Sequence, residues 1–376
     1  MHPSGPPQLP GPELSPALVG AAPVGQHVKD SRAQDAEQAL QDMLAEGSRA
    51  SASLGFGYRR LWATLADATQ GGKRVRRALF AASYQAWGGN HAASAAAIGA
   101  AIELLHTAFV VHDDVIDGDD VRHGRPNVSG SHAQQALSGG VDVARARQYG
   151  AAAGILAGDL ALAAALRAVA TCPAPRPVVH QLLDLFDSVL HITAAGELAD
   201  VRLGLGLEHP TLEEALTVQE RKTSVYSFAL PLQAGAVLAG APQTALDGGG
   251  EVGRSLGIAF QLVDDLLGVF GDGAETGKST SNDLRSGKQT PLITHARSTS
   301  AWPGIAPYVG RADLTEPQAA YVREQLTACG SRRFVETLAR DYAHDALVSS
   351  VDVGMPPALV FWITVMTEEL LERAAA

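Results

Sequence analysis

The 376-residue sequence contains only two cysteines, Cys172 and Cys329, which excludes a disulfide framework. No CxxC pair occurs, and this argues against a zinc site with thiolate ligands. Aromatic residues make up only 5% of the chain, and alternating runs of β-branched residues, the usual sign of half-buried strands, are scarce. The sequence therefore favours a helical fold without covalent cross-links.

Basic residues are also in the minority, since 29 Lys and Arg against 40 Asp and Glu give a formal net charge of −11. This balance argues against a general nucleic-acid binder, which presents a basic surface. Residues 1–20 lack the basic start and apolar core of a signal peptide, and the apolar run at 359–366 is too short to span a bilayer. Because free thiols are typical of a reducing compartment, we expect a cytoplasmic protein with no transmembrane segment and no nucleic-acid partner.

The composition divides the chain near residue 33. Residues 1–32 are rich in Pro and Gly and are predicted to form a disordered or loosely attached tail. Residues 33–376 are dominated by the good helix formers Ala, Leu, Glu, Gln and Arg, and we expect them to form one all-α domain, a single large helical bundle around a central cavity.

Apolar periodicity predicts the principal helices. Ile98, Ile102 and Leu105 recur at three- to four-residue spacing and indicate one long buried helix. Pro231 is expected to kink or break a later one. The predicted helices cover residues 94–116, 151–170, 178–201, 213–239, 250–270 and 357–375. The predicted loops, rich in Gly or polar residues, cover 118–140, 203–210 and 271–291.

Two acidic clusters, at residues 112–117 and 261–265, interrupt this apolar helical sequence. Carboxylates are rarely buried unless they are paired or bind a metal. Asp113 and Asp117 are four positions apart, so a helix places both on one face, where they repel each other unless a cation intervenes. Oxygen ligands suit Mg²⁺, and Asp264 would supply the opposite wall of one shared site. The alternative is a solvated acidic helix end.

Cationic residues near these clusters suggest a phosphorylated substrate. The segment 71–77 is a Gly-led basic turn that feeds a helix, and backbone amides with Lys or Arg side chains hold phosphate at such places. Further cations near the clusters are Arg122 and Arg125 after the first cluster, Lys222 in mid-chain, and Lys278 and Lys288 after the second cluster. For any one of these residues, the alternative is an ordinary solvated charge on the surface.

Five motifs in a fixed order make the interpretation more specific. They read GGKRVRR, ELLHTAFVVHDDVIDGDDVRHGRP, GDLAL, RKTSVYSFALPL and FQLVDDLLGVFGD…TGKSTSNDLRSGKQTPL. From about residue 50 to the C-terminus the chain resembles the trans-isoprenyl diphosphate synthase (polyprenyl synthetase) family, most of all bacterial geranylgeranyl diphosphate synthases. The resemblance implies an isoprenoid synthase fold, a homodimer, and Mg²⁺-dependent head-to-tail condensation of isopentenyl diphosphate with an allylic diphosphate (dimethylallyl, geranyl or farnesyl).

The resemblance also implies roles for individual residues. The implied Mg²⁺ ligands are Asp113, Asp117 and Asp264, supported by Asp114 and Asp265. The implied isopentenyl diphosphate contacts are Lys73, Arg76 and His106, and the allylic diphosphate contacts are Arg122, Lys222 and Lys278, with Lys288 as a further candidate. The candidate catalytic residues beside the allylic cation are Lys222, Thr223 and Gln261. In this family the released pyrophosphate takes the final proton, so no general-base side chain is required.

Three positions depart from the family pattern. Gly268 stands where the second motif usually has its last Asp, and activity is expected to survive because the first Asp makes the main metal contact. His123 stands where a second Arg usually helps to hold isopentenyl diphosphate, which puts affinity or its pH dependence in question. Residues 282–286 resemble the start of a terpene cyclase metal motif, but Thr290 replaces the expected Glu, so we interpret them as the diphosphate-binding loop.

Product length is predicted from the residues that precede the first motif. Phe109 lies one helical turn before Asp113 on the same face, and Ala108 lies beside it. In the resembling family, large side chains at these positions limit the length of the product. The small Ala108 leaves space for the growing chain at the bottom, or floor, of the site, whereas Phe109 partly fills that space. This predicts a C20 product, with C25 and C15 as alternatives. Phe109 is otherwise an ordinary core aromatic residue.

Two other functions remain open from the sequence. A class I terpene cyclase shares the all-α fold and the first motif, but it has no use for Lys73, Arg76 and His106 as isopentenyl diphosphate anchors. A non-catalytic subunit of a heteromeric prenyl transferase would be expected to lose metal ligands, whereas both Asp pairs are present here.

Overall fold

The computed structural model describes residues 31–271 and 282–375 and confirms the all-α prediction, since the described strands form only one two-stranded hairpin. The helices are α1 Ser31–Ser51, α2 Phe56–Ala68, α3 Val75–Ala86, α4 Ala92–Asp117, α5 Val128–Ser138, α6 Val143–Ala170, α7 Arg176–Gly204, α8 Leu212–Gln219, the π-helix η2 Glu220–Ala229, α9 Leu230–Ala239, α10 Gln243–Phe270, α12 Asn282–Ser286, α13 Pro291–Arg297, α14 Trp302–Ile305, the 3₁₀-helix η3 Ala306–Tyr308, α15 Glu316–Ala328, α16 Ser331–Asp352 and α17 Pro357–Ala375. The strands are β1 Val121–Arg122 and β2 Arg125–Pro126.

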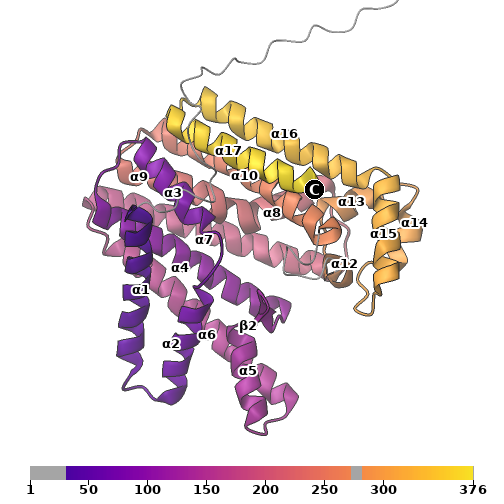
Figure 1. Ribbon diagram of the computed structural model, residues 1–376, viewed down its shortest axis with the longest axis horizontal. Coiled ribbons are helices and arrows are strands. Elements are labelled where there is room, and N and C mark those ends of the chain that lie inside the picture. Colours follow the sequence, from indigo (N-terminus) through magenta and orange to yellow (C-terminus); the bar gives the residue numbers. More distant parts are fainter. Residues whose placement is uncertain (1–30, 272–281, 376) are drawn as a thin grey trace, which may run out of the picture.

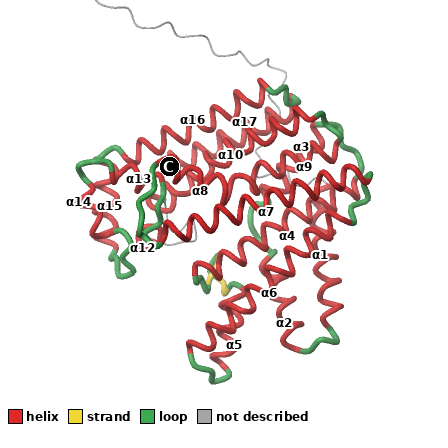
Figure 2. Tube along the Cα trace, turned by 180° about the vertical axis from the view of Figure 1, so that it is seen from behind, coloured by secondary structure: helices red, strands yellow, loops and turns green. Residues whose placement is uncertain are grey.

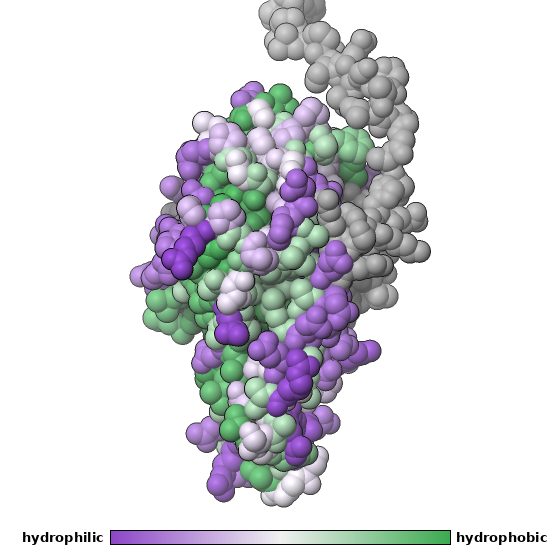
Figure 3. Space-filling view, turned by 90° about the vertical axis from the view of Figure 1, so that its left-hand side faces the viewer, coloured by the Kyte–Doolittle hydropathy of each residue, from purple (hydrophilic) through white to green (hydrophobic). Residues whose placement is uncertain are grey.

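The long helices form the body of the molecule (Figure 1). α16 and α17 run side by side along one edge and cover α10, while α1, α2 and α5 extend from the opposite edge. The view from behind shows the same arrangement, with the small hairpin beside α5 and α6 (Figure 2). The end view in Figure 3 shows hydrophobic and hydrophilic side chains mixed over the narrow face of the molecule.

Most predicted helices are confirmed: α17 has the predicted bounds, and the others are longer at one or both ends. Those predicted at 94–116, 151–170, 178–201, 250–270 and 357–375 lie within α4, α6, α7, α10 and α17. Helix α1 begins at Ser31, two residues before the predicted domain start, and residues 1–30 of the predicted tail lie outside the described residues.

Helix α4 is the central element of the larger hydrophobic core and packs against α6 and α1. Ile98, Ile102 and Leu105 are at most 1% exposed, as their spacing predicts. The helix ends at Gly118, which adopts the left-handed conformation (φ 70°) that glycine accepts without strain. This stop places the first acidic cluster in the last two turns of α4, next to open space.

The predicted loop at 118–140 is wrong, because it contains the β1–β2 hairpin and α5. The Asn127 side chain accepts a hydrogen bond from the Gly130 backbone N–H at 2.8 Å and starts α5. A side chain at Gly130 would come 2.0 Å from the carbonyl oxygen of Asp120. Gly130 therefore allows α5 to approach closely the residue that precedes the hairpin.

Pro231 is expected to kink or break the predicted helix at 213–239, and the structure contradicts the break. The segment is continuous through α8, η2 and α9, and only the type of helix changes. Pro231 lies in the first turn of α9, where the π-helix gives way to an α-helix. Short π segments of this kind are frequent at functional sites.

Glycines hold η2 tightly between α7 and α10. A side chain on Gly196 of α7 would come 2.4 Å from the backbone nitrogen of Lys222. On the other side, Gly253 and Gly257 of α10 lie as close to Ala229 and Ser224. Because backbone atoms block both faces, η2 cannot shift sideways, and its side chains are held in one position relative to α7 and α10.

Helices α4 and α6 are long and apolar enough to cross a membrane by length and composition alone. In α4, 78% of the most apolar stretch is buried inside the fold, whereas in α6 the share is 44%. The high burial of α4 explains why this stretch is apolar around most of its circumference. The lower burial of α6 leaves one apolar face of that helix exposed.

Replacement of Gly196 by Ala tests the clamp on η2. The added methyl group overlaps the backbone of Lys222, so the free energy of unfolding should fall by about 1–3 kcal/mol, as overpacking usually costs. Gly204→Ala, at the end of the same helix, meets nothing within 4 Å and serves as the control. Denaturant unfolding followed by circular dichroism measures both, and equal stability of the two variants would contradict the clamp.

Candidate active site

Both acidic clusters lie near the C-terminal ends of long helices, Asp113, Asp114 and Asp117 on α4 and Asp264 and Asp265 on α10. The negative end of a helix dipole disfavours carboxylates, so these positions need positive charge from elsewhere. The structure supplies it from η2, from the hairpin and from the segment after α12.

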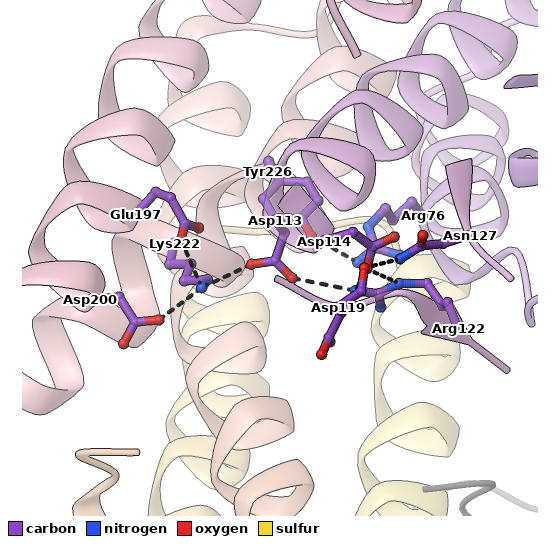
Figure 4. Close-up of polar contacts among 10 residues, drawn as sticks. All are labelled: Arg76, Asp113, Asp114, Asp119, Arg122, Asn127, Glu197, Asp200, Lys222 and Tyr226. Carbon is purple, nitrogen blue, oxygen red and sulfur yellow. Dashed lines mark hydrogen bonds and ion pairs between the residues drawn. The ribbon is translucent and has the colours of Figure 1, made fainter. Parts of the chain in front are cut away.

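Lys222 of η2 lies between Asp113 of the first cluster and two acids of α7 (Figure 4). Its Nζ is 3.0 Å from Asp113 Oδ1, 3.0 Å from Glu197 Oε1 and 2.7 Å from Asp200 Oδ2. Burial alone would lower the pKa of the ammonium group, but the charges of Asp200 and Asp113 outweigh it and raise the pKa above its ordinary value. One lysine therefore joins α4, α7 and η2 and stays charged.

Asp113 and Asp117 retain excess negative charge despite Lys222. Burial and the neighbouring charge of Asp113 raise the pKa of Asp117 to about 6, against the opposing effect of Lys222. Asp113 Oδ1 is buried and has no hydrogen-bond partner, because Lys222 approaches it closely but outside hydrogen-bond geometry. Four carboxylates, those of Asp113, Asp117, Glu197 and Asp200, therefore surround one lysine.

The hairpin brings Arg122 to the other side of α4. Its Nε donates to Asp114 Oδ1 at 2.8 Å, and its Nη2 donates to Asp113 Oδ2 at 3.4 Å. His123 and Gly124 form the two-residue turn, both with positive φ (51° and 73°), as tight hairpins require. His123 is thereby held at the exposed tip.

A second cationic group forms where α3 meets η2. Arg76 donates to Ser227 Oγ at 2.8 and 3.1 Å, and its guanidinium lies 5.0 Å from the centroid of the Tyr226 ring. The ring of His106 stacks on Tyr226 at 6.0 Å, and its Nδ1 is buried without a hydrogen-bond partner. Burial and the charges of Arg76 and Arg122 hold the pKa of His106 well below its ordinary value, so the imidazole is neutral at pH 7.

The second cluster is organised around Asp265, which is 1% exposed. Its carboxylate accepts hydrogen bonds from Gln219, from Gln261 at 3.2 Å and from Lys288 at 3.2 Å. Burial raises the pKa of Asp265 to about 6 even though Lys288 opposes the shift. Asp264, one position earlier, is exposed. Gln261 is thus held by Asp265.

Asp200 links the two clusters electrostatically. Its charge contributes to the raised pKa of Asp117 on α4 and, more weakly, to that of Lys288 beside α10. The assembly of both acidic clusters into one shared site stays a prediction. Their individual roles in binding substrate or metal stay predictions.

The remaining predicted residues lie as follows. Thr223 is half-buried beside Lys222, Ala108 is fully buried, and the Phe109 ring meets the Tyr226 ring edge-on at 4.9 Å. Lys73 is exposed in the turn before α3. Lys278 lies outside the described residues.

The sequence prediction missed Glu197, Asp200, Tyr226 and Ser227. Glu197 and Asp200 are three positions apart in an Ala-rich helical segment, so they share one face. This is the signal that identified Asp113 and Asp117, and it could have identified the α7 pair. Nothing in the local sequence singles out Tyr226 or Ser227.

The donor set fits a divalent cation of the Mg²⁺ type. Among residues 31–271 and 282–375, no three His, Cys, Asp or Glu side chains form a ready-made cage for an ion. Mg²⁺ does not need one, because it keeps several waters and usually takes one or two carboxylates plus substrate phosphates. Asp113 and Asp117, one helical turn apart, with the pKa of Asp117 raised by burial and by the charge of Asp113, fit this mode of binding.

Comparisons with known proteins agree on one family. A family model described as polyprenyl synthetase matches residues 60–304. The chain is 30% identical over 313 residues to a (2E,6E)-farnesyl diphosphate synthase of Mycobacterium tuberculosis, covering 81% of this chain and 80% of that one. It is 30% identical over 290 residues to an octaprenyl diphosphate synthase of Escherichia coli, covering 74% and 79%.

A solved structure extends the likeness to three dimensions. It is the geranylgeranyl pyrophosphate synthase of Corynebacterium glutamicum complexed with isoprenyl diphosphate and magnesium. It superposes with a TM-score of 0.82 at 28% identity and covers 90% of this chain and 99% of that one.

Replacement of Lys222 by Met tests its role as counter-ion. Three partly buried carboxylates then face one another unpaired, so the variant should be less stable by about 1–3 kcal/mol at neutral pH, below the cost of a fully buried charge. Without the ammonium the carboxyl pKa values rise above those of the unfolded chain, so the folded variant binds more protons and loses stability as the pH increases.

The deficit relative to the native protein should therefore be larger at about pH 8 than at about pH 5. Arg167→Met is the control, because Arg167 forms an exposed ion pair with Glu46 that contributes little. Urea unfolding at both pH values measures the effect. A pH-independent deficit would contradict the counter-ion role.

Proposed function

Since the chain belongs to the polyprenyl synthetase family and is a trans-prenyl diphosphate synthase, we propose that its product is geranylgeranyl diphosphate (C20). It would form this product by Mg²⁺-dependent, head-to-tail addition of isopentenyl diphosphate to an allylic diphosphate. Names of relatives do not decide the length, because they include farnesyl and octaprenyl as well as geranylgeranyl synthases.

The position of Phe109 carries the C20 proposal. The residue lies one turn from Asp113 on the face of α4 that meets η2, and its half-buried ring packs edge-on against Tyr226. Ala108 beside it is fully buried and adds little bulk. One aromatic side chain next to a small one limits the space for the growing prenyl chain only in part. This supports a product of intermediate length.

The cations of the site support diphosphate binding on two sides. Arg122 and Lys222 flank the first acidic cluster, and Arg76 with neutral His106 forms a separate group behind Tyr226. Arg and Lys donate charge-assisted hydrogen bonds to phosphate oxygens, so each group suits one substrate. Holding both substrates in this way brings the allylic carbon and the double bond together.

Bound Mg²⁺ would neutralise the charge that develops on the departing diphosphate. Asp113, Asp117 and Asp264 are the proposed ligands, and the Corynebacterium relative, which was solved with magnesium, supports this choice of metal. Lys222 is already held beside Asp113 by η2, so its positive charge is in place before any substrate arrives.

We also propose a cytoplasmic homodimer. Helix α6 is nearly as apolar as α4 but less buried, and Tyr149, Ile155 and Leu156 are all more than 40% exposed. A second copy of the chain would cover this face. The two free cysteines support a reducing compartment.

The test of the proposed activity uses the purified full chain with Mg²⁺, labelled isopentenyl diphosphate and, separately, dimethylallyl, geranyl and farnesyl diphosphate. We expect incorporation that ends at C20, and none when Mg²⁺ is chelated. No incorporation with any primer would contradict the proposal. Geranylgeranyl diphosphate alone should remain unchanged, whereas a terpene cyclase would convert it to a hydrocarbon or alcohol.

Replacement of Phe109 by Ala tests the floor. Removal of the ring should shift the main product from C20 to C25 or longer, with activity retained, because the growing chain gains space beyond the first motif. Phe334→Ala on α16, a half-buried aromatic residue of a different core cluster, is the control and should keep the native product. An unchanged product distribution in active Phe109→Ala would remove Phe109 from this role.

A further inference from the structure

Gly268 of α10 stands at the position where the second acidic motif usually has its last Asp. It lies four positions after Asp264, so the two residues share one face of the helix, one turn apart. The second acidic motif of this chain therefore lacks a side chain on the face that carries its proposed metal ligand.

A carboxylate from another element fills the space. A Cβ built on Gly268 would lie 2.3 Å from Asp283 Oδ2, and the three nearest heavy atoms all belong to the Asp283 carboxylate. Two non-bonded atoms cannot approach so closely, so the Asp283 side chain occupies the position in which a side chain at 268 would begin. Asp283 belongs to α12, which follows α10 in the chain.

The backbone on both sides of Asp283 is held by hydrogen bonds. Leu284 beside it is buried in the core, and its carbonyl oxygen accepts a hydrogen bond from the Gly310 N–H at 2.7 Å. Arg285 donates to the carbonyl oxygen of Leu314 at 3.1 Å. The carbonyl oxygen of Asp283 itself accepts from the Lys288 N–H at 3.1 Å. These contacts fix α12 and aim the Asp283 carboxylate at α10.

The two acids of the second cluster differ in their cationic partners. Lys288 reaches Asp265 at 3.2 Å, so Asp265 has a cationic partner of its own. Asp264 is exposed on the same face as Gly268. Asp264 and Asp283 are therefore the two carboxylates of this cluster placed to share a further cation.

We propose that Asp283 replaces, from α12, the carboxylate that is absent at Gly268, and that it acts with Asp264 on one divalent cation. The proposal rests on the proposed Mg²⁺ dependence of the enzyme. It also explains why residue 268 is glycine, since any side chain there would displace Asp283.

The test measures metal binding rather than activity. Mn²⁺ serves as the probe, and electron paramagnetic resonance measures free Mn²⁺ in the presence of the full chain and inorganic pyrophosphate. Asp283→Asn should bind Mn²⁺ about 10- to 100-fold more weakly, the usual effect of losing a supporting partner of a metal site. Asp247→Asn removes an exposed carboxylate near the opposite end of α10 and should bind like the native chain.

A rescue experiment separates this role from a purely structural one. Asp283→Ala removes the atoms that a side chain at 268 would meet, so its combination with Gly268→Asp returns a carboxylate to the same face and should recover most of the Mn²⁺ affinity. Gly268→Ala alone should weaken Mn²⁺ binding, because its methyl group displaces Asp283 while the acid remains in the chain. Thermal unfolding of each variant checks that it is folded. Native-like Mn²⁺ affinity in both Asp283→Asn and Gly268→Ala, or no recovery in a folded double variant, would overturn the proposal.

The outcome is separable from that of the proposed function. If the chain makes no prenyl product but Mn²⁺ binding still depends on Asp283, the inference stands and the proposed product is wrong. If the chain makes a C20 product while Mn²⁺ binding is independent of Asp283, the inference is wrong and the proposed product stands.

Discussion

The contact of one ammonium group with three carboxylates, Lys222 with Asp113, Glu197 and Asp200, determines how the rest of the site is arranged. The three acids come from α4 and α7, and each helix would be destabilised by its acids without a counter-charge. Lys222 meets all of them only because η2 is held against α7 and α10 through glycine contacts. The electrostatic balance of the site therefore depends on the close packing of the π-helix.

The alternation of acids and bases in the site suits a ligand that carries both signs of charge, such as an anion bound together with metal cations. Acids at the C-terminal ends of α4 and α10 and bases on η2, the hairpin and α3 alternate around one region, so neither sign of charge is fully neutralised by the chain. A diphosphate with divalent cations supplies both signs at once. The apolar residues of α4 then lie behind the charged rim, in line with Asp113, as the prenyl chain of the product requires.

Much of this could be predicted from the sequence, and what could not has physical causes. Periodic apolar residues identified the long helices because burial dictates their spacing, and closely spaced acids identified both clusters. The glycine content of residues 118–140 misled, because this segment contains the hairpin and α5. The space that Gly268 leaves for Asp283 depends on a tertiary contact that the sequence does not show. Tyr226 and Ser227 were missed because their importance arises from tertiary contacts that local spacing does not encode.

The clamped π-helix also limits how the length of this protein can vary. One residue turns an α-helix by about 100° and a π-helix by somewhat less. An insertion or deletion within Glu220–Ala229 would therefore rotate Lys222 away from its partners, and the glycine contacts would prevent the helix from adjusting. The loop at 205–210, whose Gly206 and Leu207 are exposed, has no such restriction. Evolutionary change in chain length is thus expected at this loop, whereas the residue count of η2 should stay constant among sequences that keep the site.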